Sequence, residues 1–236
     1  MSAELLINVT PSESRVALIE NGILQEIHVE RHTKRGLVGN IYRGKVSRVL
    51  PGMQAAFVDI GLEKAAFLHA SDIVIHNEIA EEVSASHIQK QDIRELVRDG
   101  QDIVVQVVKD PIGTKGARLT TDITIPSRYL VFMPSVTHVG VSQRIEEEAE
   151  RERLKDLVQE FCDENGGFIL RTAAEGVGKN ELQQDAAFLR RLWDKIQSRM
   201  KKRKSNVLYE DLPLARRVLR DFVGTELDRI RIDSKL

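Results

Sequence analysis

The sequence predicts an α+β protein made of several small domains. Residues 39–68 hold β-branched and aromatic runs interrupted by glycine and proline, which is typical of short strands joined by tight turns. Residues 144–200 instead carry apolar side chains at helical spacing. A chain of 236 residues with 42% hydrophobic and 30% charged residues can bury one large core or two to three small ones.

The first 30 residues predict an antiparallel meander. Strands are expected at 5–9, 15–20 and 23–30. Pro11 and Ser12 make the first turn. Asn21 and Gly22 form a strong hairpin signal because both residues tolerate positive φ. The polar residues 33–37 are expected to connect the meander to the next domain.

Residues 39–68 and 100–121 together predict a small five-stranded antiparallel barrel. In the first stretch, strands are separated at Gly44, Pro51-Gly52 and Gly61. In the second, Ile103, Val105 and Val107 alternate with their neighbours, and residues 109–116 form a turn. Such a barrel binds nucleic acid where exposed aromatic side chains lie beside lysines or arginines.

A polar insert at 72–99 interrupts the barrel. It carries the histidines and carboxylates His76, Glu78, Glu81, Glu82 and His87. The separation of the two histidines fits no common metal-ligand spacing, so we expect a solvated loop and a short helix at 93–97 rather than a metal site.

From residue 126 onward the pattern predicts an α/β unit. A buried strand is expected at 129–133, with 139–142 as its partner, and another at 168–170. A helix over 144–164 presents Leu154, Leu157, Val158 and Phe161 on one face, with Cys162 beside it, and stops at Gly166-Gly167. A second helix is expected over 180–200, with the apolar residues Leu182, Phe188, Leu189, Leu192, Trp193 and Ile196 along it.

Composition limits the functional classes. The formal net charge of −1 means that any nucleic-acid binding must come from local patches. The single cysteine, Cys162, excludes an internal disulfide and a thiolate-only zinc site within one chain, and it fits a reducing cytoplasm. We expect no export and no membrane insertion, because there is no basic apolar leader and no apolar run of spanning length.

Several motifs carry a family resemblance. Gly44-Lys45-Val46, QAAFVDIG at 54–61, AFLH at 66–69 and GARLT at 116–120 resemble an S1-type RNA-binding domain, which is an OB fold. Together with residues 3–17 and GGFILRTAA at 166–174, they make the chain similar to the RNase E/G family of endoribonucleases over essentially all 236 residues.

The resemblance implies four segments. These are an RNase H-like part at 1–38, the S1 domain at 39–125, a 5′-sensor α/β unit at 126–206 and a second, incomplete RNase H-like part at 207–236. A helix at 214–223 and a strand at 229–233 would complete the split layer. Residues 5–9 offer no carboxylate for a metal, so the layer is expected to be a scaffold without RNase H chemistry.

The resemblance also assigns RNA contacts. Phe57 and Phe67 match positions where bases stack, an interaction worth about 1–3 kcal/mol per base, and Lys115 matches a basic contact. From the residues alone, the two phenylalanines also fit a core role. Arg43, Lys45 and Arg118 are auxiliary candidates, with ordinary solvated side chains as the alternative.

A 5′-phosphate site is implied at Val131, Arg171 and Thr172. A guanidinium at a strand end can bind a terminal phosphate with two parallel hydrogen bonds, and the adjacent hydroxyl adds a donor. A monophosphate fits such a site, whereas a triphosphate is too large. The alternative for Arg171 is a surface arginine. The basic run at 199–204 also has two interpretations: it binds RNA phosphates, or it is a solvated helix end.

In the RNase E/G family, which this sequence resembles, carboxylates of a later subdomain hold magnesium that activates water. A cysteine pair after that subdomain shares a structural zinc between subunits. Neither segment is in this sequence, so no catalytic residue and no metal site are expected here. The chain is interpreted as the RNA-recognition half of an enzyme that cuts single-stranded, A/U-rich RNA in rRNA maturation and mRNA decay, and as inactive alone. Expected partners are 5′-monophosphorylated single-stranded RNA and, through strand or domain exchange, further copies of the chain. The alternatives are a complete, non-catalytic RNA-binding adaptor and a purely structural partner.

Overall fold

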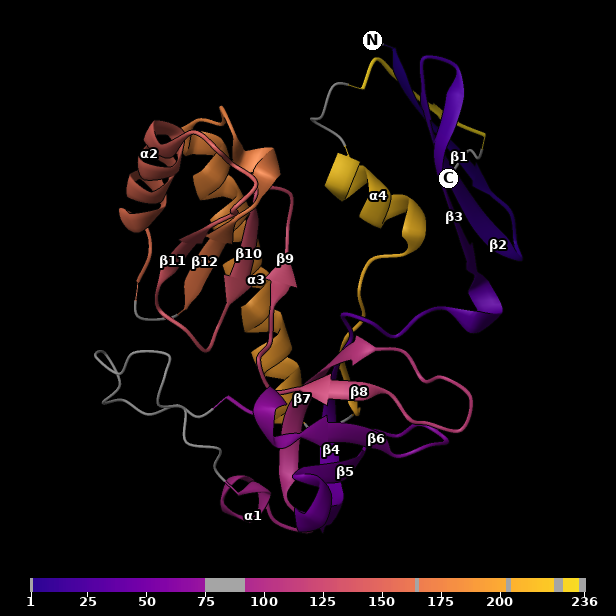
Figure 1. Ribbon diagram of the computed structural model, residues 1–236, viewed down its shortest axis with the longest axis vertical. Helices are drawn as coiled ribbons and strands as arrows, with labels where there is room; N and C mark the ends of the chain where they lie inside the picture. The colour runs from indigo at the N-terminus through magenta and orange to yellow at the C-terminus, as the bar shows by residue number, and fades with distance from the viewer. Residues whose placement is uncertain (1, 75–91, 164–165, 203–204, 223–226, 234–236) are drawn as a thin grey trace.

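The computed structural model describes residues 2–74, 92–163, 166–202, 205–222 and 227–233. Its strands form three sheets, and its buried apolar side chains form three hydrophobic cores. In Figure 1 the barrel lies at the bottom, the α/β unit and a four-stranded sheet lie above it on opposite sides, and helix α4 lies between these two. The α+β prediction is confirmed. None of the described helices is long and apolar enough to cross a membrane.

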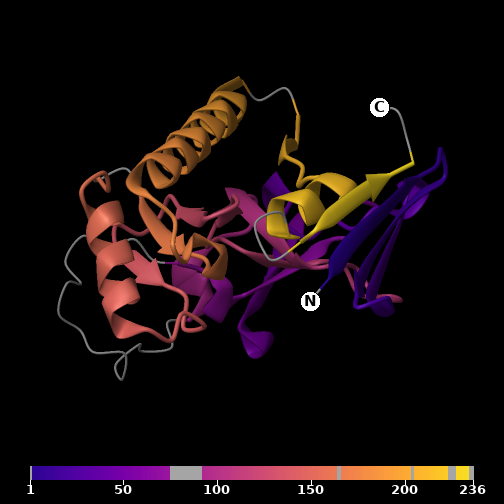
Figure 2. The ribbon, with the colours of Figure 1, turned by 90° about the horizontal axis from the view of Figure 1, so that it is seen from above.

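The four-stranded sheet joins the two ends of the described chain. Strands β1 (Ala3–Val9), β2 (Glu13–Glu20) and β3 (Ile23–Arg31) form the predicted antiparallel meander, and β14 (Arg229–Ile232) pairs in parallel with β1. The hairpin at Asn21 and Gly22 is confirmed, with φ angles of 50° and 78°. Helix α4 (Leu214–Phe222) covers one face by packing Leu214 and Val218 against Leu5, Ile7 and Val16. Figure 2 shows α4 beside this sheet.

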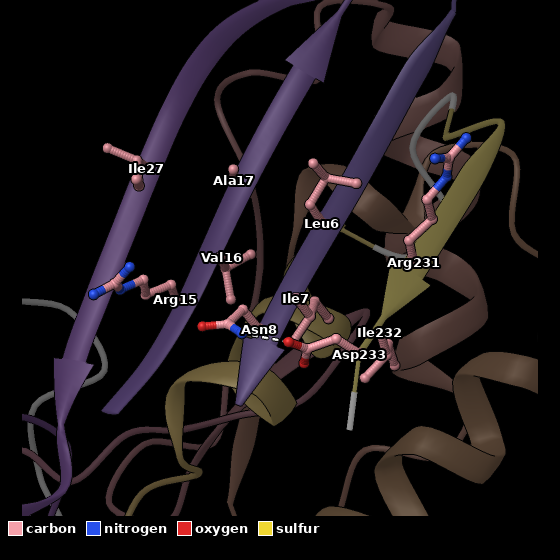
Figure 3. A pocket seen from close by; sticks show the side chains of 10 residues that line it. All are labelled: Leu6, Ile7, Asn8, Arg15, Val16, Ala17, Ile27, Arg231, Ile232 and Asp233. Atoms are coloured by element: carbon pink, nitrogen blue, oxygen red, sulfur yellow. Dashed lines mark hydrogen bonds between the residues drawn. The ribbon is translucent and has the colours of Figure 1, made fainter. Parts of the chain in front are cut away.

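The opposite face of this sheet carries apolar side chains that α4 does not cover. Leu6, Ala17 and Ile27 line a shallow hollow of 320 Å³, and Asn8 donates a hydrogen bond to Asp233 at its edge (Figure 3). Ile27 is 60% exposed, and it lies on β3, the last strand of the sheet.

The predicted barrel is confirmed, with one correction. Its strands are β4 (Ile41–Leu50), β5 (Ala55–Asp59), β6 (Ala66–His69), β7 (Asp102–Lys109) and β8 (Arg118–Thr120), and pairing of β4 with β7 closes it. The prediction that every pair is antiparallel was wrong, because β6 and β8 run parallel. A closed ring with an odd number of strands cannot alternate direction all the way round, so one neighbouring pair must be parallel.

Gly44 was predicted to separate two strands, but it lies inside β4. A Cβ there would stand 2.5 Å from Cγ1 of Val58 and 3.0 Å from Cγ2 of Ile60, so the glycine makes room for the barrel core. The turns at 51–53, 32–34 and 70–72 are short 3₁₀ helices, η2 (Pro51–Met53), η1 (His32–Lys34) and η3 (Ala70–Asp72). A short helix, α1 (Ile93–Leu96), confirms the expectation at 93–97. The part of the insert that carries His76, Glu78, Glu81, Glu82 and His87 lies outside the described residues.

The α/β unit contains β9 (Ile125–Pro126), β10 (Leu130–Met133), β11 (Val139–Val141) and β12 (Gly167–Leu170), covered by α2 (Glu148–Gln159) and α3 (Lys179–Lys202). The predicted pairing of the second strand with the first was wrong. Strand β11 pairs in parallel with β12, and β12 separates β11 from β10. The reason is that α2 connects β11 to β12, and a helical crossover joins parallel neighbouring strands.

The two helices also differ from prediction. Helix α2 is shorter than 144–164, ending at Gln159, while Cys162 packs against the core as expected and burial raises the pKa of its thiol. Phe188 is 49% exposed rather than packed. It directly precedes Leu189, so a turn of about 100° takes it off the buried face of α3.

Strand β13 (Val207–Tyr209) joins two units. It pairs antiparallel with β4 at Tyr42 and Ile41, although its residues fall in the segment expected to complete the split layer. Leu208 and Ile41 belong to the core under α3, so the barrel and the α/β unit share buried contacts. The predicted domain boundaries stay predictions.

Candidate nucleic-acid interface

Phe57 and Phe67 lie opposite each other on adjacent barrel strands. Their rings are 6.2 Å apart and inclined by 68°, an edge-to-face contact. Their neighbours Ala56, Val58 and Leu68 are buried in the barrel core, so strand alternation directs both phenylalanines to the outer surface. Both rings are half-buried, and neither belongs to the buried core of the barrel.

The two rings line a hollow of 750 Å³ on the outside of the barrel. Met53 and Ile112 add apolar surface, and they are 58% and 74% exposed. Four cationic side chains line the same hollow, namely Lys64, Lys109, Lys115 and Arg118. The hollow therefore combines apolar surface of base size with positive charge, the composition that single-stranded nucleic acid requires.

The cationic side chains differ in the hydrogen bonds that they already make within the protein. Arg118 donates two hydrogen bonds to Asp72, at 2.9 and 3.2 Å, and these raise the pKa of its guanidinium. Lys64 donates to the carbonyl of Gly113 at 2.6 Å. Lys115 lies in the turn that its backbone closes with Ile112, and no ion pair holds its ammonium among the described residues.

Of the three auxiliary candidates, only Arg118 lines the hollow. Arg43 instead donates to the carbonyl of Met200 near the end of α3, and Lys45 is not among the residues lining the hollow. Sequence reasoning missed Met53, Ile112 and Lys64, which lie in turns whose path the sequence does not reveal. It also missed His69, whose ring lies 6.5 Å from that of Phe67. Side chains two positions apart on a strand lie on the same face, so the spacing of Phe67 and His69 could have indicated this contact.

The predicted phosphate site lies in the α/β unit. Phe132 and Phe168 point into the core, so the alternating positions Val131 and Ile169, which are cross-strand partners, lie on the opposite face of the sheet. Arg171 follows Ile169 by two positions and continues this face. Thr172 is exposed and begins η4 (Thr172–Ala174).

The Arg171 guanidinium has protein partners. Its Nη1 donates to the carbonyl oxygens of Ser127 at 2.6 Å and Arg128 at 3.4 Å, and its Nη2 lies 2.8 Å from Oδ1 of Asp221 on α4. Asp185 of α3 fixes this loop, because its carboxylate accepts the Ser127 hydroxyl and the backbone N–H groups of Tyr129 and Leu130. Arg171 is thus firmly oriented.

Asp221 also contacts its neighbour Arg220, whose Nε and Nη2 donate to the carboxylate at 3.0 Å each. Burial alone would raise the pKa of Asp221, but the hydrogen bonds from Arg220 and Arg171 outweigh it and lower that pKa. Arg220 reaches Asp211 as well, at 3.5 Å. Nearby, burial raises the pKa of Tyr209 to about 12.

The basic region around the end of α3 is partly structural. Arg190 pairs with Asp163 and donates to the carbonyl of Phe161, and Arg199 donates to the carbonyl of Leu208. Lys201 and Lys202 are exposed, and residues 203 and 204 lie outside the described part of the chain.

An outward-facing aromatic pair beside lysines on a five-stranded barrel is the arrangement with which barrels of this class bind single-stranded nucleic acid. Comparison agrees, since residues 37–119 match the S1 RNA binding domain and residues 124–236 match the Ribonuclease E/G family. Over all of its length the chain is 68% identical to Ribonuclease G of Escherichia coli (strain K12) and 64% identical to Ribonuclease G of Haemophilus influenzae, covering 48% of each. It is 38% identical over 220 residues to Ribonuclease E of a Nostoc species, covering 92% of this chain and 31% of that protein. The chain is thus similar to members of the ribonuclease E/G family over its whole length, and it spans about half the length of the Ribonuclease G relatives.

Proposed function

We propose that this chain is the RNA-recognition part of an endoribonuclease that cleaves single-stranded, A/U-rich RNA in rRNA maturation and mRNA decay. The observation that carries the proposal is the outward-facing pair Phe57 and Phe67, which lines a hollow together with Lys115. Its relatives are named ribonucleases, which supports the reaction class.

The binding mechanism follows from the hollow. Bases stack on the phenylalanine rings because every base has a π-face, and the lysines attract the phosphates between them. Since the chain has a net charge of −1, binding depends on this local arrangement rather than on the charge of the whole molecule.

Replacing Phe57 or Phe67 by alanine tests the proposal. Each change should weaken binding of a fluorescent A/U-rich oligonucleotide about fivefold or more, because stacking contributes about 1–3 kcal/mol per base. Fluorescence anisotropy measures the affinity. Phe188→Ala is the matched control, since Phe188 is 49% exposed on α3 and does not line the hollow.

Equal affinities of the wild type, Phe57→Ala and Phe67→Ala would contradict the proposal. Thermal unfolding of each variant separates the two roles considered for these residues. A core phenylalanine would cost several kcal/mol of stability when truncated, whereas a half-buried surface ring should cost much less.

The proposal extends to the RNA 5′ end. Arg171, Thr172 and Val131 would receive a terminal monophosphate, supported by the strand-end position of Arg171 and by the exposed Thr172 hydroxyl beside it. The preferred partner would then be single-stranded RNA with a 5′ monophosphate. A charged donor in two-point contact with phosphate gives the required selectivity.

The remaining expectations belong to the same proposal. The sheet of β1, β2, β3 and β14 with α4 would be an RNase H-like layer, and its exposed strand β3 supports association with further copies. The whole enzyme would act in the cytoplasm with magnesium and a structural zinc. The described residues gather no group of three or more His, Cys, Asp or Glu side chains, so we assign no metal step to them. This chain alone is expected to bind RNA without cutting it.

A further inference from the structure

The Arg171 guanidinium is already bound to a carboxylate. Asp221 lies 2.8 Å from its Nη2, and both side chains are about one quarter exposed. We propose that Asp221 is a built-in competitor for the 5′ phosphate, a residue that lowers the affinity of the site for phosphorylated RNA ends. This inference rests on the proposed 5′-phosphate function of Arg171.

The location of Asp221 favours an electrostatic role. It lies in the last turn of α4, where the helix dipole disfavours negative charge. Two arginines compensate for this, because the carboxylate is held between Arg171 and Arg220. Asp221 therefore marks a position where two guanidinium groups together hold one anionic group.

A phosphate can replace this carboxylate because both groups are anionic acceptors for a charge-assisted hydrogen bond from Nη2 of Arg171. Little else has to move. The Nη1 atom of Arg171 stays on the carbonyl of Ser127, and Arg220 keeps its second carboxylate, Asp211, 3.5 Å away. Only the Asp221 side chain has to leave the guanidinium.

The competition acts on phosphorylated ends only. A terminal monophosphate carries a charge of about −1.5 to −2 at pH 7, so it outcompetes a carboxylate of charge −1 for the same arginine. A 5′-hydroxyl end offers no such charge and leaves the ion pair of Arg171 with Asp221 intact. Asp221 thus lowers the affinity for the monophosphorylated end and leaves the affinity for the hydroxyl end unchanged.

The test compares two oligonucleotides of the same sequence, one with a 5′ monophosphate and one with a 5′ hydroxyl, by anisotropy titration at fixed salt. Asp221→Asn removes the charge but keeps the shape of the side chain. It should tighten binding of the monophosphate form about fivefold, the upper range for a partly exposed ion pair, and leave the hydroxyl form unchanged. Asp221→Glu keeps the competing charge and should stay near the wild type.

Two controls complete the experiment. Glu160→Gln removes the same charge from another ion pair, with Lys179, and should change neither affinity. Arg171→Ala should abolish any preference for the monophosphate, in the wild type and in the Asp221→Asn background alike. Thermal unfolding confirms that each variant is folded.

The outcomes separate the two hypotheses. If the wild type prefers the monophosphate through Arg171 but Asp221→Asn leaves the preference unchanged or reduces it, the competitor role is wrong and the phosphate site stands. If neither the wild type nor Asp221→Asn distinguishes the two ends, both are wrong. A preference that appears only in Asp221→Asn supports both, with the wild-type site masked by its own carboxylate.

Discussion

Gly116 shows how tightly single residues constrain the face that carries the hollow. A Cβ at this position would stand 1.9 Å from the carbonyl oxygen of Ala65, closer than any real contact. The chain passes here between the Lys115 turn and β8, next to β6. The missing side chain is therefore what lets Lys115 approach the strand that carries Phe67.

We predict that Gly116→Ala destabilises the protein by about 1–3 kcal/mol, since the backbone of β6 would have to move aside. Chemical denaturation measures the change. Gly52→Ala is the control, because no atom lies within 4 Å of a Cβ there, and it should change stability by less than about 0.5 kcal/mol. Equal effects of the two changes would contradict the prediction.

Among the elements, α2 is joined to the loop before α3 by one carboxylate. Glu150 accepts two hydrogen bonds from Arg153, at 2.6 and 2.7 Å, and one from the backbone N–H of Gly176 at 2.8 Å. The bonds from Arg153 lower the pKa of Glu150 from 4.5 to about 2, against the opposing effect of burial and with help from Gly176. The first turn of α2 thus depends on an ionised side chain.

This arrangement predicts a pH dependence of stability. Because the pKa of Glu150 is lower in the folded state, its contribution is present above pH 4.5 and is lost as the pH falls toward 2. The melting temperature of the wild type should therefore fall more between pH 5 and pH 3 than that of Glu150→Gln. Glu152→Gln, an exposed residue of the same helix, should behave like the wild type.

The elements also show what the sequence can and cannot reveal. Local periodicity predicted most of the strands but not β9 or β13, and the turn residues Asn21 and Gly22 predicted the first hairpin. It did not predict that β11 pairs with β12, because strand pairing depends on the crossover through α2. For the site, the residues alone left Phe57 and Phe67 undecided between core and surface, and only the family resemblance favoured the surface. The contact of Arg171 with Asp221 joins positions 50 residues apart in sequence, and no local pattern encodes it.

At the scale of the whole molecule, charge is balanced overall and uneven locally. The net charge is −1, yet Lys64, Lys109 and Lys115 gather around one hollow. Arg118 adds little, because Asp72 already neutralises it. RNA binding should therefore involve few phosphates and depend only moderately on salt.

We predict that the logarithm of the RNA-binding constant falls with the logarithm of salt concentration with a slope of about −2, since three neutralised phosphates on a single strand each contribute about −0.7. Lys115→Ala should make the slope shallower by about 0.7, and Lys155→Ala on α2 should not change it. Titrations at four salt concentrations measure both slopes. A slope that Lys115→Ala leaves unchanged would remove Lys115 from the interface.

The parallel pairing of β1 with β14 can form only late in the synthesis of the chain. These strands lie more than 200 positions apart, since Ala3 bonds to Asp228 across 225 residues. A ribosome adds about 5–20 residues per second, so β1 emerges roughly 10–45 s before its neighbour exists. Meanwhile the barrel and the α/β unit can complete themselves. One edge of the first strand made is therefore the last to be paired, and a nascent chain must keep that edge from foreign strands until synthesis reaches β14.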